Sequence, residues 1–90
     1  MKTVKAIASG KVQGVGFRVY TQQKAQQLGV KGYVRNLNNG DVEIIATGEV
    51  AAVNELLKWA KSGSPSAVVN NLEVDAIKNT EEFAKFEIRR

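Results

Sequence analysis

Hydrophobic and polar residues alternate near the start of the chain, and this period of two is typical of a strand with one buried face. The alternation covers residues 3–12. Its inward positions are Val4, Ala6 and Ala8. From residue 17 the spacing becomes helical, and Gly29 is in the right place to cap the C-terminus of this helix. The predicted apolar stripe of the helix consists of Phe17, Tyr20, Ala25 and Leu28.

Two further strands follow, over residues 31–37 and 41–47. Asn39-Gly40 separates them, and this dipeptide is the strongest short-range signal for a two-residue hairpin turn. The second of these strands alternates clearly, apart from Ile45. Its predicted inward residues are Val42, Ile44 and Ala46, and its predicted outward residues are Asp41, Glu43 and Thr47.

A second helix is predicted after Gly48-Glu49, and the turn-forming residues 63–66 end it. Its buried stripe consists of Val53, Leu56, Leu57 and Ala60. A strand over residues 67–77 comes next, followed by a polar turn at residues 79–82 and a short final strand. In these two strands the residues in phase are Leu72, Val74 and Ala76, then Ala84, Phe86 and Ile88.

The predicted order is therefore βαββαβ with a short closing fifth strand. Two helices on one face of a mostly antiparallel sheet make an α+β sandwich. This split βαβ arrangement is the ferredoxin-like plan. Ninety residues fit one domain of this kind, spanning residues 1–90.

The amino-acid composition limits which catalytic groups and which ligands the protein can use. The chain has no cysteine and no histidine, which excludes disulfides, thiol nucleophiles and the commonest general base. No apolar run approaches the ~18 residues of a membrane helix, and the start lacks a secretory signal, so we expect a cytoplasmic protein without membrane contact. The net charge of +4 favours small anionic ligands.

The strongest candidate for a site is the stretch of residues 10–18, where the first strand runs into the first helix. Gly14 and Gly16 allow positive φ, and successive free N–H groups in such a turn form a concavity that suits an anion. Arg18 adds a planar cation that can grip a phosphate with two hydrogen bonds. We call residues 13–18 the cradle. On spacing alone, a tight turn with a solvated arginine is an equally good interpretation, and the stretch is neither a Walker A loop nor a dinucleotide fingerprint.

Residues 12–18, Val-Gln-Gly-Val-Gly-Phe-Arg, resemble the signature of the acylphosphatase family. The second motif of that family, Gly-x-Val-x-Asn, is matched by residues 32–36 at the usual distance, and the resemblance covers nearly the whole chain. It implies the ferredoxin-like fold. It also implies a monomeric hydrolase that cleaves the carboxyl–phosphate bond of small acyl phosphates, with inorganic phosphate as product or inhibitor and with no metal or cofactor.

The resemblance also implies roles for individual residues. Arg18 would hold the phosphoryl group and Asn36 would orient the attacking water, although the residues alone indicate a turn former at Asn36. The backbone N–H groups of the cradle would bind the phosphate; they belong to Val15, Gly16, Phe17 and Arg18. Supporting roles would fall to Gln13, Gly14 and Thr21, although Gln13 could simply brace a turn and Thr21 could equally face solvent.

Two other functions remain open. The same strand order occurs in RNA-recognition domains, and residues 31–33 begin like their signature, but Val34 and Arg35 break it and aromatic residues make up only 7% of the chain. We therefore expect no specific nucleic-acid partner. The other alternative is an acylphosphatase-like domain with a regulatory role or a place in a larger carbamoyl-transfer system; the lack of an appended domain favours a free-standing enzyme.

Overall fold

The computed structural model describes residues 1–78 and 81–89. Its elements follow the predicted order, with boundaries within one or two residues of the predicted ones for the first four strands. They are β1 (Lys2–Lys11), α1 (Phe17–Leu28), β2 (Lys31–Asn36), β3 (Val42–Gly48), α2 (Val50–Ala60), β4 (Val68–Ala76) and β5 (Phe86–Arg89).

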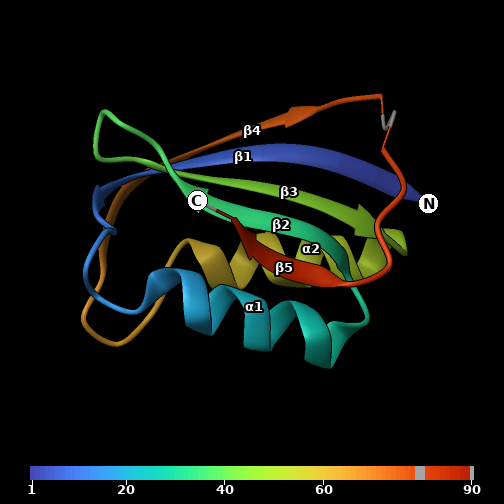
Figure 1. Ribbon diagram of the computed structural model, residues 1–90, viewed down its shortest axis with the longest axis horizontal. Helices are drawn as coiled ribbons and strands as arrows, with labels where there is room; N and C mark the ends of the chain where they lie inside the picture. Colours follow the sequence, from blue (N-terminus) through green and yellow to red (C-terminus); the bar gives the residue numbers. More distant parts are fainter. Residues whose placement is uncertain (79–80, 90) are drawn as a thin grey trace.

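The five strands form one sheet in the order β4-β1-β3-β2-β5, and both helices cover the same face of it (Figure 1). Neighbouring strands run antiparallel except β2 and β5, which pair in parallel. The predicted ferredoxin-like α+β fold with a short closing strand is confirmed. Because β1 and β2 both run toward the same end of the sheet, the loops that follow them lie at that end.

The core lies between the sheet and the helices. On β1 the buried residues are Val4, Ala6 and Ala8, as predicted. In α2 the predicted stripe holds for Val53, Leu56 and Ala60, with Leu57 half-buried at its edge. In α1 the stripe differs by one residue, because Tyr20 is exposed and Thr21 is fully buried. Positions 17, 21 and 25 are each four residues apart and share one face of a helix, whereas residue 20 is rotated away from that face.

The C-terminus of α1 is capped as predicted. Gly29 adopts a left-handed φ of 71°, and its N–H donates to the carbonyl of Gln26. The N–H of Val30 donates to the carbonyl of Ala25 over 2.9 Å. This pair of bonds is the Schellman motif, which turns the chain directly from α1 into β2.

The hairpin between β2 and β3 differs from the prediction. Its loop has three residues, 38–40, because the N–H of Leu37 already donates to the carbonyl of Asp41. A two-residue type I′ turn would need positive φ at both Asn39 and Gly40. Only Gly40 has it, at 95°, so the third loop residue is needed to close the hairpin.

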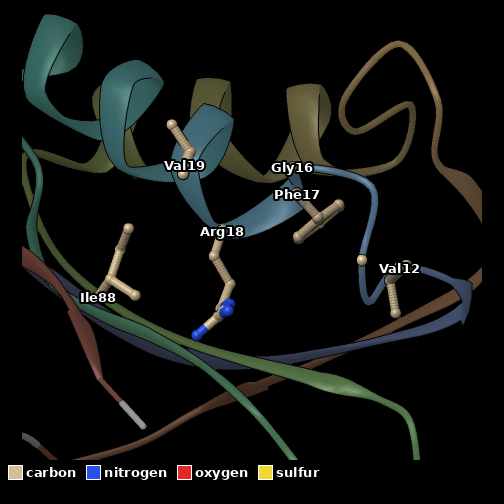
Figure 2. Close-up of a pocket in the computed structure, with 7 residues that line it drawn as sticks. Val12, Gly16, Phe17, Arg18, Val19 and Ile88 are labelled. Atoms are coloured by element: carbon tan, nitrogen blue, oxygen red, sulfur yellow. The ribbon is translucent and has the colours of Figure 1, made fainter.

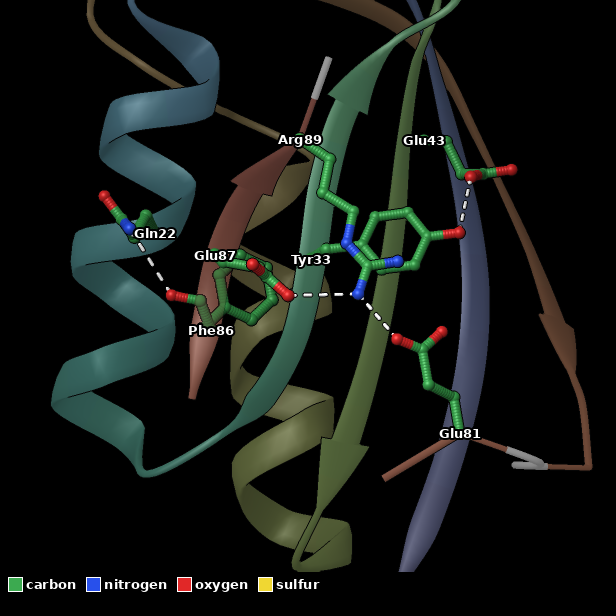
Figure 3. Close-up of polar contacts among 7 residues, drawn as sticks. All are labelled: Gln22, Tyr33, Glu43, Glu81, Phe86, Glu87 and Arg89. Carbon is green, nitrogen blue, oxygen red and sulfur yellow. Dashed lines mark hydrogen bonds and ion pairs between the residues drawn. The ribbon is translucent and has the colours of Figure 1, made fainter. Parts of the chain in front are cut away.

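The central strand β3 is buried along its whole length, which corrects the predicted exposure of Glu43 and Thr47. Glu43 lies on the open face of the sheet, where Tyr33 and Arg35 donate hydrogen bonds to its carboxylate and Lys5 pairs with it (Figure 3 shows the Tyr33 bond). Burial by itself raises the pKa of Glu43. The bonds from Arg35 and Tyr33 and the attraction of nearby cations outweigh that effect, and the pKa lies below its ordinary value.

The remaining differences concern the end of the chain. Leu72 is half-buried, but Val74 and Ala76, predicted to be in phase with it, are exposed because β4 is an edge strand that the helices do not cover. Ala84 lies before β5 rather than in it, and Phe86 is the buried residue of that strand. Of the predicted polar turn, Asn79 and Thr80 lie outside the described residues.

No helix in residues 1–78 or 81–89 is both long and apolar enough to cross a membrane.

Candidate active site

Two glycines give the cradle its shape. Gly14 and Gly16 adopt φ values of 74° and 76°, in the left-handed region that side chains other than glycine avoid. A Cβ atom added to Gly14 would meet nothing within 4 Å, so the backbone conformation, rather than lack of space, requires glycine there. These two turns take the chain from the end of β1 to the start of α1 within five residues, 12–16.

The N-terminus of α1 opens onto the cradle. Gly16 is its N-cap residue and has no side chain to bind the first N–H groups of the helix, and the first turn contains no acidic residue. The first main-chain bond of the helix runs from the N–H of Tyr20 to the carbonyl of Gly16. The N–H groups of the preceding residues therefore have no partner within the helix, and together with the helix dipole they favour an anion.

A hollow of about 130 Å³ lies beside these groups. Its lining residues are Val12, Gly14, Gly16, Phe17, Arg18, Val19 and Ile88. Figure 2 shows the Arg18 side chain leaving the first turn of α1 and extending into the hollow toward the sheet. The structure thus places a guanidinium group and the start of a helix around one small space, which is the arrangement that phosphate recognition requires.

Asn36, the last residue of β2, does not line this hollow. It lies two residues after the buried Val34, on the face of the sheet that the helices cover. The oxygen Oδ1 of Asn36 is buried and has no hydrogen-bond partner among the described residues. A buried amide oxygen without a partner is costly, so a bound water or ligand group is expected to satisfy it.

Gln13 connects the cradle to the hairpin that follows Asn36. Its Nε2 donates to the carbonyl of Leu37 over 2.8 Å and to the carbonyl of Asp41 over 2.9 Å. Both acceptors belong to the closing residues of the β2–β3 hairpin. Gln13 therefore braces a neighbouring turn rather than its own, and it fixes the end of β2 relative to the cradle.

Ser64 is a residue of the site that the sequence analysis did not identify. It is 2% exposed, and its hydroxyl donates to the carbonyl of Val15 over 2.9 Å. In the sequence, the run Gly63-Ser64-Pro65-Ser66 indicates the end of α2 and forms part of the family resemblance, but it assigns no role to Ser64. Nothing in the linear pattern shows that a residue 49 positions away reaches the cradle.

The other predicted residues contribute indirectly. Phe17 is buried, and its ring packs 5.8 Å from that of Trp59, which anchors the start of α1 to α2. Gly63 leaves room for this ring, because a Cβ atom there would come within 2.7 Å of it. The hydroxyl of Thr21 donates to the carbonyl of Phe17 over 2.7 Å, so Thr21 stabilises the first turn of α1 from within. Val15 is half-buried and does not line the hollow.

Among residues 1–78 and 81–89, no group of three or more acidic, cysteine or histidine side chains lies close enough together to hold a metal ion.

Comparison with known proteins connects this geometry to one family. The model of the acylphosphatase family matches residues 4–88. An acylphosphatase of Acaryochloris marina is 51% identical over 87 residues, which cover 97% of this chain and 92% of that protein. An acylphosphatase of Caldivirga maquilingensis is 48% identical over 87 residues, covering 96% of this chain and 92% of that protein. The crystal structure of an acylphosphatase from Bacillus subtilis superposes with a TM-score of 0.95 at 34% identity, and each chain covers 100% of the other.

Proposed function

The chain belongs to the acylphosphatase family, hydrolases that convert acyl phosphates to a carboxylate and inorganic phosphate, and we propose that Arg18 and Asn36 are its catalytic residues. The position of Arg18 carries the proposal, because its side chain extends into the glycine-lined hollow at the start of α1. In this proposal the guanidinium holds the phosphoryl oxygens together with the N–H groups of residues 15–18. Fixed donors of this kind stabilise the charge that spreads over the phosphoryl oxygens in the transition state.

Asn36 orients the attacking water in this proposal. Its buried, unpartnered Oδ1 can accept a hydrogen bond from water, and its position is tied to the cradle through Gln13. The water oxygen bonds to phosphorus as the bond between phosphorus and the bridging oxygen breaks. The carboxylate leaves with that electron pair, and the proton of the water passes to a phosphoryl oxygen. The carboxylate is a good leaving group, so the reaction needs positioning and charge stabilisation rather than a strong acid.

Hydrolysis of benzoyl phosphate in the presence of a chelator tests these roles. We expect Arg18→Ala to weaken both turnover and competitive inhibition by inorganic phosphate, because the arginine contacts the phosphate in the ground state and in the transition state. Asn36→Ala should lower kcat about a hundredfold or more and leave inhibition by phosphate nearly unchanged, because it acts on the water.

Asn38→Ala is the matched control, since this asparagine lies two residues further on, exposed in the hairpin loop. It should hydrolyse benzoyl phosphate like the parent. Parental turnover by a folded Asn36→Ala variant would contradict the proposed role of Asn36. Arg18→Lys separates charge from geometry, because a lysine keeps the charge and loses the planar fork.

We also propose that the protein works as a cytoplasmic monomer without a specific nucleic-acid partner. A chain without cysteine needs no oxidising compartment to fold. Arg89 lies 4.3 Å above the ring of Tyr33, which leaves that ring poorly placed to stack on a base. Sedimentation at the monomer mass of 9.8 kDa, with full activity, is the expected result.

A further inference from the structure

The hollow around Arg18 has two kinds of wall. Gly14, Gly16 and Arg18 present main-chain and guanidinium groups, whereas the other lining side chains are hydrocarbon. Phosphoryl oxygens need hydrogen-bond donors, and a hydrocarbon wall offers none. The apolar residues therefore suit a different part of the substrate from the phosphate.

The apolar residues fall into two groups. Figure 2 shows Val19, from α1, and Ile88, from β5, on one side of the Arg18 side chain, with Val12 and Phe17 on the other. Val12 and Phe17 are buried, at 2% and 1% exposure, and belong to the core. Val19 is 48% exposed and Ile88 is half-buried, so these two form the accessible apolar surface next to the guanidinium group.

The size of the hollow limits what it can enclose. It measures about 130 Å³, and a cavity of about 150 Å³ holds a single benzene molecule. Phosphate and a bulky acyl group together exceed this space. With the phosphoryl group held at the cradle, a bulky acyl group one bridging oxygen away must extend past Arg18 to the surface beside it.

We propose that Val19 and Ile88 form an acyl subsite that favours large apolar acyl groups, aromatic or branched, over small or polar ones. The proposal rests on the proposed function, which places the phosphoryl group beside Arg18. An apolar acyl group covers hydrocarbon that is otherwise in contact with water. A carbamoyl group gains little there, because its amide meets two side chains that have no hydrogen-bonding atoms.

The experiment compares kcat/KM for benzoyl phosphate with kcat/KM for acetyl phosphate. The double variant Val19→Thr, Ile88→Thr replaces a methyl group of Val19 and the ethyl group of Ile88 by hydroxyl groups, so threonine keeps the shape of valine and is one carbon shorter than isoleucine. We expect the benzoyl-to-acetyl ratio to fall about tenfold, the effect of removing one or two apolar contacts. The intrinsic reactivity of each substrate is the same for every variant, so the change in the ratio measures the contribution of Val19 and Ile88 alone.

Val50→Thr is the matched control. Val50 is a helical valine with 49% exposure, and it does not line the hollow. It should leave the ratio at the parental value. Inhibition by inorganic phosphate should change by less than about twofold in the double variant, because phosphate alone does not reach the wall.

A binding measurement separates this proposal from the catalytic one. Benzoylphosphonate and acetylphosphonate cannot be hydrolysed, and calorimetry measures their affinities without turnover. A preference for benzoylphosphonate in the parent that is lost in the double variant supports the subsite, even if Asn36 proves not to orient the water. An unchanged benzoyl-to-acetyl ratio in a folded double variant overturns the subsite and leaves the roles of Arg18 and Asn36 intact.

Discussion

Two side chains fix the cradle to neighbouring segments by donating hydrogen bonds to main-chain carbonyls. Ser64 binds the carbonyl of Val15, and Gln13 binds the carbonyls of Leu37 and Asp41. In a trans peptide the C=O of Val15 and the N–H of Gly16 point in opposite directions within one plane. Because Ser64 fixes the oxygen, it also fixes the direction of the Gly16 N–H.

Ser64→Ala is expected to weaken inhibition by inorganic phosphate and to lower kcat/KM, each about tenfold, because one cradle N–H loses its fixed orientation. Stability should fall by about 1 kcal/mol, the usual effect of losing such a bond. Inhibition constants and urea unfolding measure the two effects. Ser66→Ala, at an exposed position of the same loop, should behave like the parent.

Gln13→Ala is expected to lower the rate and to leave phosphate binding nearly unchanged, whereas Ser64→Ala lowers both. The link from the cradle to the end of β2 is lost, so kcat should fall about tenfold or more while inhibition by phosphate changes little. Steady-state kinetics with benzoyl phosphate measure both quantities, and Gln23→Ala on the exposed surface of α1 is the control. Equal losses of binding and of rate would contradict this positioning role.

At the residue scale the sequence could predict only local features. Gly14, Gly16 and Arg18 are close in sequence, so their spacing alone indicates a turn and a cation beside it. Ser64 and Ile88 reach the site from loops and strands far along the chain, and no periodicity encodes which distant side chain arrives there. Thr21 was open between two interpretations, because a helical threonine can face solvent or the preceding turn with equal ease.

Among the elements, β2 passes too close to the backbone of β3 at Gly32 for a side chain to fit between them. This glycine adopts a φ of 139°, and a Cβ atom there would lie 1.9 Å from the carbonyl oxygen of Ile45. Gly32 opens the second motif, whose last residue is Asn36, so the same close packing sets the position of the strand that carries the asparagine. In this motif Gly32 is required for strand packing, and Asn36 is the residue proposed to act in the reaction.

Gly32→Ala is expected to destabilise the protein by about 3 kcal/mol or more, because the added methyl group forces two strand backbones apart. Gly40→Ala is the matched comparison. It has positive φ as well, at 95°, but meets nothing within 4 Å, so it should cost only about 1 kcal/mol of strain. Urea unfolding of both variants measures the difference, and similar losses would show that strain rather than crowding dominates at Gly32.

At this scale the periodic patterns predicted helices and central strands well, because these elements bury one face. The prediction was weaker for β4 and β5 at the edges of the sheet. An edge strand has a neighbour on one side only, so alternation no longer indicates burial, as Val74 shows. The hairpin loop was mispredicted because Asn-Gly favours a tight turn but does not exclude a longer one closed by Gly40.

Across the whole molecule, the open face of the sheet carries a network of charges. Glu43 at the centre binds Arg35 and Tyr33. Further out, Arg89 pairs with Glu81 and Glu87, and Figure 3 shows these pairs together with the bond between Tyr33 and Glu43. Hydrogen bonding to these two carboxylates raises the pKa of Arg89. Burial and the bond to Glu43 raise the pKa of Tyr33. Strand alternation predicts an outward direction for Glu43, but it cannot show which side chains from other strands cover its carboxylate.

The free energy of unfolding should therefore depend on pH through the ionisation of Glu43. Its pKa in the folded protein lies below the ordinary value of 4.5, so its stabilising effect is present above about pH 4.5 and is lost as the pH falls through the folded pKa. In the Glu43→Gln variant the free energy of unfolding should fall less on acidification than in the parent. Urea unfolding between about pH 3 and pH 6 measures the slopes. Glu55→Gln, at an exposed position of α2, should keep the parental slope, and a parental slope in Glu43→Gln would contradict the assignment.

The strand order has a consequence for how the protein is made. β1 leaves the ribosome first, yet it lies inside the sheet, where Lys2 is opposite Gly48 and Val4 is opposite Ala76. The first strand cannot complete its hydrogen bonds until β4, near the other end of the chain, has been synthesised. Bringing such distant segments together lowers the entropy of the chain before the contacts that stabilise the sheet have formed. One edge of β1 can pair with β3 as soon as residues 42–48 are available, but its other edge stays unpaired until residues 68–76 have been synthesised, so the sheet is expected to be completed only after that point.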